Sequence, residues 1–132
     1  MPTSAKLQRL ILAVVVLCGW AGCYASGAPQ RPPTETGTAV YYSDKMDGRR
    51  VFLKGERYNK NALTAATHSR YPMGSMLRVT NLSNGRSVTV RVNDRMSPRS
   101  KATIDLSRKA AEEIGMIKSG HAKVKIELVQ AK

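Results

Sequence analysis

Three residues of this chain could together carry out acid–base chemistry: Glu56, His68 and Asp94. A glycosidic bond is cut when a carboxylic acid protonates the leaving oxygen while a second group handles the proton of the nucleophile. Two carboxylates and a histidine supply that set of groups. Because the three residues stand far apart in the sequence, they can act together only if the fold gathers them.

Each of the three residues also has an ordinary structural interpretation. Glu56 could be a solvated loop acid that pairs with Arg57, and His68 could be an exposed loop histidine. Asp94 could cap backbone N–H groups at a turn, as aspartate often does. The residue types therefore raise an enzymatic hypothesis that the spacing alone cannot decide.

Two other titratable residues are expected to be structural. Asp105 precedes Leu106 and Ser107 at a predicted helix start, where we expect it to act as a cap, and His121 has no partner in the sequence. With two histidines, no cysteine beyond residue 23 and no ligand spacing, the sequence predicts no metal site and no cofactor.

A predicted β-hairpin positions Asp94. Valines alternate with polar residues over 87–92, which is the period of a half-buried strand, and residues 76–80 form its partner. Asn84-Gly85 between them tolerates positive φ at both centres of a tight turn. We expect the second strand to stop at Asn93-Asp94-Arg95, so that a rigid element holds the carboxylate.

The remaining pattern predicts a mainly β domain. Several short strands with one short helix are typical of a small β-barrel. Ser107 is a suitable cap for the helix, and Gly115 would end it. The other predicted elements are strands over 38–42, 102–105 and 122–129 and a helix over 107–114.

The first 22 residues are predicted to be a signal peptide. Lys6 and Arg9 precede an apolar run over 10–22, which is shorter than the roughly 20 residues that a bilayer span needs. An uncleaved anchor is the alternative. Residues 25–36 contain several prolines and few apolar residues, so we expect 23–36 to be a tether and 37–132 to be the folded domain.

The end of the signal peptide resembles the lipobox of bacterial lipoproteins. Trp20-Ala21-Gly22-Cys23 would make Cys23 the lipidated first residue of an anchored protein. No aspartate follows Cys23, so the outer membrane, facing the periplasm, is the expected destination. Ordinary cleavage near Ala25 or Ala28, giving a secreted or periplasmic protein, is the alternative.

The chain is strongly basic. It carries 22 Lys and Arg against 9 Asp and Glu, and without the two cations of the signal peptide the balance is 20 against 9, or +11. Such a surface suggests a polyanionic partner, and export favours an acidic cell-wall polymer or anionic lipid headgroups over nucleic acid. The few aromatic residues form no base-stacking platform, so we expect no nucleic-acid partner. Simple solubility is the alternative.

From Gly37 to Glu127 the chain resembles the rare lipoprotein A (RlpA) family of bacterial envelope lipoproteins. Some members of that family are endolytic peptidoglycan transglycosylases. The resemblance implies a six-stranded double-psi β-barrel with one or two short helices and a monomer. The sequence segments that match are Gly37–Tyr42, Gly55–Tyr58, Ala62–Ala66, Pro72–Gly74, Leu77–Leu82, Asn84–Val88, Arg91–Arg95 and Ile104–Ser107.

The resemblance also implies the site. The family's glutamate and aspartate fall on Glu56 and Asp94, while its histidine falls on His68 counting back from Pro72 but on Thr67 counting forward from Glu56. Asp94 is implied to be the main acid or base. Substrate contacts are implied for three neighbours of these residues: Tyr58, Asn93 and Arg95.

Two departures from the family pattern lie beside the site. Met96-Ser97-Pro98 stands where Gly-Pro is expected, and residues 51–54 replace a small polar turn. Both could reshape the groove.

The implied reaction is non-hydrolytic cleavage between N-acetylmuramic acid and N-acetylglucosamine, which leaves a 1,6-anhydro end. Peptide-free glycan strands are the implied substrate, and their exposed lactyl carboxylates would suit a basic domain. The alternatives are an expansin-like barrel that binds glycan without cutting it and a structural envelope lipoprotein, because one fold hosts many functions.

Overall fold

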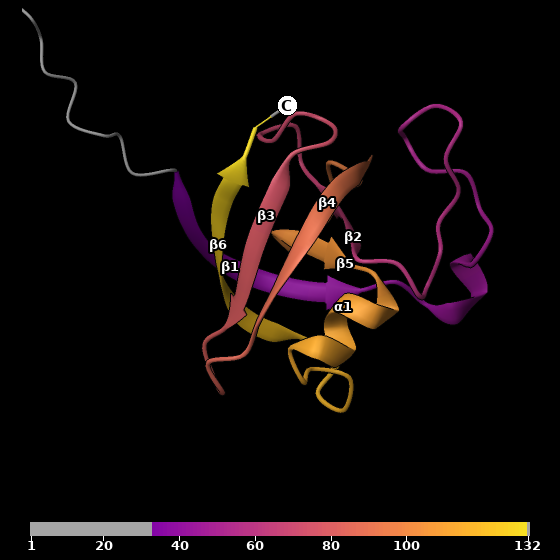
Figure 1. Ribbon diagram of the computed structural model, residues 1–132. Coiled ribbons are helices and arrows are strands. Elements are labelled where there is room, and N and C mark those ends of the chain that lie inside the picture. Colours follow the sequence, from indigo (N-terminus) through magenta and orange to yellow (C-terminus); the bar gives the residue numbers. More distant parts are fainter. Residues whose placement is uncertain (1–32, 132) are drawn as a thin grey trace, which may run out of the picture. The chain divides into compact units, whose positions relative to one another are not determined.

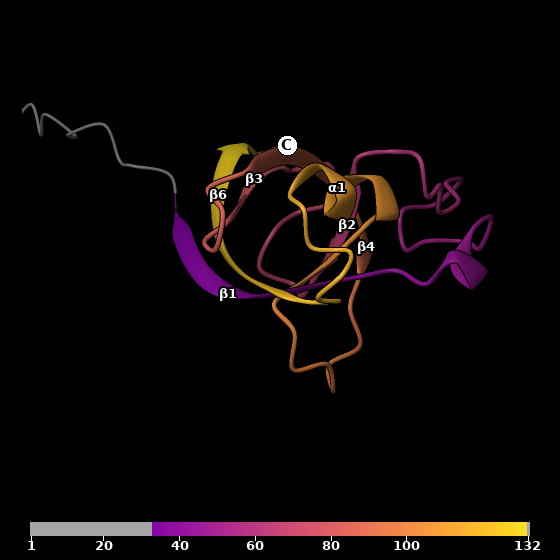
Figure 2. The ribbon, with the colours of Figure 1, turned by 90° about the horizontal axis from the view of Figure 1, so that it is seen from below.

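The computed structural model describes residues 33–131, so the predicted signal peptide and the predicted lipidation site at Cys23 lie outside the described residues. Six strands close into a barrel in the order β1-β5-β2-β4-β3-β6 (Figures 1 and 2). The predicted six-stranded barrel with one or two short helices is confirmed. The elements are β1 (Thr34–Tyr41), η1 (Asp44–Met46), β2 (Thr64–Thr67), β3 (Met76–Asn81), β4 (Ser87–Arg95), β5 (Ile104–Leu106), α1 (Arg108–Glu113) and β6 (Ala122–Gln130).

The barrel mixes parallel and antiparallel pairs. β1 pairs with β5 and β2 with β4 in parallel, and the other four neighbouring pairs are antiparallel. The alternating valines of β4 face the interior together with alternating residues of β3 and β6. Burying each such side chain stabilises the fold by about 1.5–3 kcal/mol. The largest fully buried aliphatic residues of the strands are Leu77, Val79, Val90, Val92, Ile104, Leu106, Val124 and Ile126.

The hairpin of β3 and β4 is confirmed, with two differences. Among residues 33–131 no residue other than glycine has positive φ, so only Gly85 (φ 74°) takes the conformation expected of both turn residues. Asn84 instead donates from Nδ2 to the Ile114 carbonyl at 3.0 Å, which ties the turn to the end of α1. The second difference is that β4 continues to Arg95 and does not stop at Asn93, because β2 pairs with it through Arg95.

The first strand begins earlier than predicted. Thr34 already pairs with Glu127 of β6, so β1 takes up three residues that were assigned to the tether. Within it, a Cβ at Gly37 would lie 2.0 Å from Thr103 Oγ1. That hydroxyl accepts a hydrogen bond from Thr38 N at 3.2 Å. The close approach of Thr103 to Gly37 therefore allows the segment between β4 and β5 to bond to β1.

The strand β2 was not predicted because its pattern gives no alternation. All four of its residues are buried, as happens when a strand is covered on both faces. The predicted helix and last strand are confirmed. Ser107 Oγ accepts from Ala110 N at 3.3 Å and caps α1, and Gly115 follows the helix with φ 69°.

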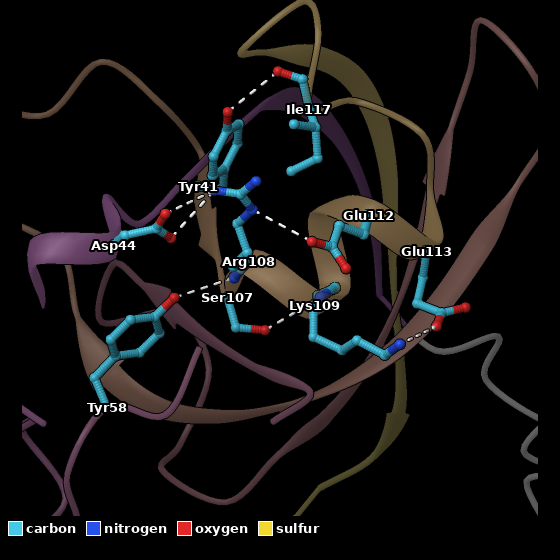
Figure 3. A network of polar contacts seen from close by, with 10 residues as sticks. Tyr41, Asp44, Tyr58, Ser107, Arg108, Lys109, Glu112, Glu113 and Ile117 are labelled. Carbon is cyan, nitrogen blue, oxygen red and sulfur yellow. Dashed lines mark hydrogen bonds and ion pairs between the residues drawn. The ribbon is translucent and has the colours of Figure 1, made fainter. Parts of the chain in front are cut away.

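A long loop over residues 43–63 projects from the barrel between β1 and β2 (Figure 1). It is fastened to α1, because Tyr58 Oη accepts from Arg108 N at 3.1 Å and Arg108 Nη1 donates to Asp44 Oδ2 at 2.9 Å (Figure 3). Gly48 N also donates to the Tyr58 carbonyl at 2.8 Å, which folds the loop back on itself. The loop is therefore held in a defined position on the domain.

Within residues 33–131, no helix is long and apolar enough to cross a membrane. In the same part of the chain, no three His, Cys, Asp or Glu side chains gather in a way that could hold a metal ion.

Candidate functional site

Barrel closure brings two carboxylates to the same place. Ala66 of β2 pairs with Asp94 of β4 on one side and with Asp105 of β5 on the other. Paired residues on neighbouring strands present their side chains on the same face of a sheet. Asp94 and Asp105 therefore flank Ala66 on the outside of the barrel, beneath the 43–63 loop, where Ala66 packs in a small cluster with Tyr42 and Tyr58.

A β-bulge aims Asp94 at this face. Ala65 pairs with Val92 but Ala66 pairs with Asp94, so Asn93 is the extra residue in β4. A bulge leaves two successive residues on the same side. Val92 and Asn93 are accordingly both buried, and the next side chain, Asp94, turns outward toward Asp105.

Asp94 accepts three hydrogen bonds. Its Oδ2 accepts from Tyr42 Oη at 2.5 Å, and its Oδ1 accepts from Phe52 N at 2.8 Å and from Arg95 N at 2.9 Å. Burial, and next the hydrogen bond to Asp94, raise the pKa of Tyr42, so the phenol keeps its proton and remains a donor. Three hydrogen bonds fix the orientation of this carboxyl group. Asp94 thus fills the capping role and still stands in the carboxylate pair.

Asp105 has the opposite environment. Within the described residues its Oδ1 is buried and has no hydrogen-bond partner. Burial, and next the charge of Asp94, raise the pKa of Asp105 to about 6. A carboxyl group that keeps its proton to near neutral pH beside a second carboxyl group is an arrangement used in general acid catalysis. The predicted capping role of Asp105 is wrong, because Ser107 caps the helix.

Glu56 is held by Arg91 and not by Arg57. The Arg91 guanidinium makes a two-pronged contact, with Nη1 donating to Oε2 at 2.9 Å and Nη2 donating to Oε1. The hydrogen bond to Glu56 is the main cause of the raised pKa of Arg91. Arg57 instead donates to the Gly48 carbonyl at 2.9 Å. Glu56 is therefore a fixed carboxylate at the rim, with its side chain 30% exposed.

A pocket of about 520 Å³ lies along residues 50–57. Phe52 and Glu56 both line it, which connects it to the carboxylate pair through the bond from Phe52 N to Asp94. Three cations also line it: Arg50, Lys54 and Arg57. The pocket combines an apolar ring, a carboxylate and positive charge, a mixture that suits a polar ligand with an anionic substituent.

His68 follows β2 directly and lies beside this region. Its Nε2 is 3.1 Å from the Ala102 carbonyl, a contact in which the ring nitrogen must be the donor because a carbonyl oxygen only accepts. Arg95 Nη1 donates to the His68 carbonyl at 3.4 Å and to Thr67 Oγ1 at 3.2 Å. Thr67 is 1% exposed, so His68 and not Thr67 is the residue of the two that a substrate could reach.

Comparison with known proteins decides the family. The family model described as lytic transglycolase matches residues 34–126. The chain belongs to this family. The predicted double-psi β-barrel and the predicted resemblance to RlpA are confirmed.

Curated relatives of this lytic transglycolase domain carry one name. "Endolytic peptidoglycan transglycosylase RlpA" of Campylobacter jejuni is 49% identical over 96 residues, which are 73% of this chain and 34% of that protein. The protein of the same name from Neisseria meningitidis is 47% identical over 96 residues, covering 73% of this chain and 39% of that protein. The chain thus spans just over a third of the length of these relatives.

The fold of the lytic transglycolase domain also occurs in an expansin. A Clavibacter michiganensis expansin mutant, solved with cellohexaose, matches with a TM-score of 0.57 at 21% identity, covering 74% of this chain and 51% of that chain. At this level of identity the likeness concerns the fold alone.

Two of the three implied substrate contacts are not accessible in this lytic transglycolase domain. Tyr58 is 2% exposed, with its ring 4.4 Å from that of Tyr42, centroid to centroid, and its hydroxyl on Arg108 N. Asn93 is 3% exposed because the bulge turns it inward. Both side chains make structural contacts in the domain, and their implied contacts with substrate stay predictions. Arg95 remains at the surface of the site.

Sequence reasoning missed three partners in the site: Tyr42, Arg91 and Asp105. Asp105 did carry a signal. Ile104 and Leu106 on either side of it are both fully buried, so the period of two turns Asp105 to the opposite face. Tyr42 and Arg91 carried none, since their partners Asp94 and Glu56 are distant in the sequence.

Proposed function

We propose that this protein is a peptidoglycan lytic transglycosylase that cleaves the bond between N-acetylmuramic acid and N-acetylglucosamine without water. The observation that carries the proposal is the pair of carboxylates on either side of Ala66, with Asp105 holding its proton to a pKa of about 6 and Asp94 bound by three donors. Membership of the lytic transglycolase family and the names of the curated relatives support it.

In the proposed reaction Asp105 is the acid and Asp94 the base. Asp105 gives its proton to the bridging oxygen as the bond from that oxygen to the muramic acid anomeric carbon breaks. The 6-hydroxyl of the same muramic acid bonds to that carbon, and its proton passes to Asp94. One proton has left Asp105 and one has reached Asp94, so proton exchange with solvent resets the site. Glu56, fixed by Arg91, and His68 position the glycan.

The proposed substrate is a peptide-free glycan strand. Removing the stem peptides exposes a lactyl carboxylate on each muramic acid. The cations of the pocket, Arg50, Lys54 and Arg57, would attract those groups, as would the net charge of +11 (20 Lys and Arg against 9 Asp and Glu) that remains without the signal peptide. Binding of strands should therefore weaken as salt rises, and salt-independent binding would contradict this choice of substrate.

The test compares the purified protein with two variants, Asp105→Asn and Asp94→Asn, on peptide-free glycan strands analysed by mass spectrometry. We expect anhydro-ended fragments from the wild type and at least a hundredfold slower release from either variant. Circular dichroism and a glycan co-sedimentation assay confirm that the variants fold and bind. Intact strands from the wild type, with strands still co-sedimenting, would replace the enzyme by a glycan-binding barrel.

We also propose that the protein is an outer-membrane lipoprotein that faces the periplasm and acts as a monomer in wall remodelling and septation. The lipobox-like Trp20-Ala21-Gly22-Cys23 and the basic n-region support this. Expression in a Gram-negative host followed by membrane fractionation tests it. A Cys23→Ser variant should lose the mass of the lipid and leave the outer-membrane fraction, and an unchanged distribution would contradict lipidation.

A further inference from the structure

Phe52 is the exception among the aromatic side chains of the described residues. Phe52 is 64% exposed, whereas Tyr41 is partly buried and Tyr42, Tyr58 and Tyr71 are 8% exposed or less. We infer that the Phe52 ring is a stacking platform for one sugar of the glycan strand, placed next to the carboxylate pair. The inference rests on the proposed substrate and adds a binding subsite to it.

The backbone fixes Phe52 beside the acid pair. Phe52 N donates to Asp94 Oδ1 at 2.8 Å, and Leu53 N donates to the Asn93 carbonyl at 3.0 Å, so the loop is bonded to the end of β4 at two successive residues. Glu56 N donates to the Leu53 carbonyl at 3.1 Å and closes a tight turn. Because the backbone of Phe52 bonds Asp94 directly, we expect a single sugar that stacks on the Phe52 ring to reach the Asp94 carboxyl group.

A cation orients the ring. The Arg95 guanidinium carbon is 5.8 Å from the centroid of Phe52, within the range of a cation–π contact. Arg95 is itself held by hydrogen bonds to Thr67 and to the His68 carbonyl. With one side of the ring against a fixed cation, little conformational freedom remains to be lost when a ligand stacks on the part that faces solvent.

The surroundings favour a sugar over a purely apolar ligand. A pyranose presents C–H groups on its faces and hydroxyls around its edge, so it needs an aromatic surface bordered by polar groups. Phe52 lines the pocket of about 520 Å³ together with Glu56 and cationic side chains, which supply that border.

The test replaces the ring and leaves the backbone bond to Asp94 in place. Phe52→Ala should raise KM for peptide-free glycan strands about fivefold to tenfold with a smaller change in kcat. Phe52→Tyr should restore KM, because it keeps the ring. Leu82→Ala is the matched control, since Leu82 is 51% exposed but lies in the turn between β3 and β4.

A second readout does not need cleavage. The full chain has one tryptophan, Trp20, so Phe52→Trp adds a fluorophore at the subsite. Saturating glycan strands should shift its emission to shorter wavelength, with no such change in the wild type. Unchanged emission, or strand binding by Phe52→Ala equal to that of the wild type, would overturn the platform. If strands bind and shift the emission but are not cut, the platform stands and the proposed enzyme fails.

Discussion

The Tyr42 hydroxyl donates to Asp94 Oδ2 at 2.5 Å and so joins the end of the first strand to the end of the fourth. Because burial and this hydrogen bond raise the pKa of Tyr42, the phenol never competes with Asp105 as the acid of the site. Its role is to hold the Asp94 carboxyl group in one orientation. In the proposed reaction this bond therefore positions the base, Asp94, while Asp105 is the acid.

Replacing Tyr42 by phenylalanine tests that division. Tyr42→Phe keeps the ring that packs on Tyr58 and removes one hydrogen bond to a charged group, a loss of about 1.5–3 kcal/mol in the free energy of unfolding. We expect kcat on glycan strands to fall at least tenfold while the fold is retained. Wild-type kcat in a destabilised variant would show that the bond serves stability alone.

Asp105 should impose a pH dependence on stability. Its pKa is about 6 in the folded protein against 3.8 ordinarily, so between these values the folded state binds more protons than the unfolded state. Stability therefore falls as pH rises from about 4 to about 6, by at most about 3 kcal/mol, and then levels off. In urea unfolding at several pH values, Asp105→Asn should flatten this part of the curve. The exposed Glu113→Gln should not, and a slope that survives Asp105→Asn would assign the titration to another group.

The same titration should limit activity. If Asp105 is the acid, kcat falls as pH rises through about 6, since the carboxyl loses the proton that it must donate. A pH profile of anhydro-product release measures this. A falling limb centred well above 7 would point to another acid.

The contact between Glu56 and Arg91 should matter for activity more than for stability. Both side chains are about a third exposed, so the ion pair contributes less than about 1 kcal/mol to folding. Arg91→Met should nevertheless raise KM severalfold, because Glu56 loses its fixed orientation. Arg70→Met removes the ion pair with Glu35 at 2.7 Å, outside the pocket, and is the control. Equal effects of the two substitutions would contradict a positioning role.

Gly37 should tolerate no side chain. A Cβ there would lie 2.0 Å from Thr103 Oγ1 and 2.6 Å from its Cβ, so β1 or the segment before β5 must move. Gly37→Ala should lower the free energy of unfolding by about 1–3 kcal/mol, measured by urea unfolding. Adding Thr103→Gly should restore part of the loss. A double variant no more stable than the single one would show that the close contact is not the cause.

The sequence predicted the strands of the domain better than the side-chain contacts of its site. Alternation located β3, β4 and β6, because their core-facing valines and isoleucines recur at every second residue. The same rule failed for β2, which is buried on both faces. In the site, short sequence segments were enough to indicate Glu56 and Asp94. Their partners Arg91, Tyr42 and Asp105 are brought to them only when the barrel closes. The bulge at Asn93 left no sign in the residue types, and it alone decides that Asn93 is buried while Asp94 is not.

Ala66 separates Asp94 from Asp105, and each of the three residues comes from a different strand. In a chain that is still folding, the two aspartates are ordinary solvated carboxyl groups, both ionised at neutral pH. The unequal pair arises only when β2 is seated between β4 and β5. The proposed chemistry therefore requires the completed barrel, and we expect no fragment that lacks one of these strands to carry out any part of it.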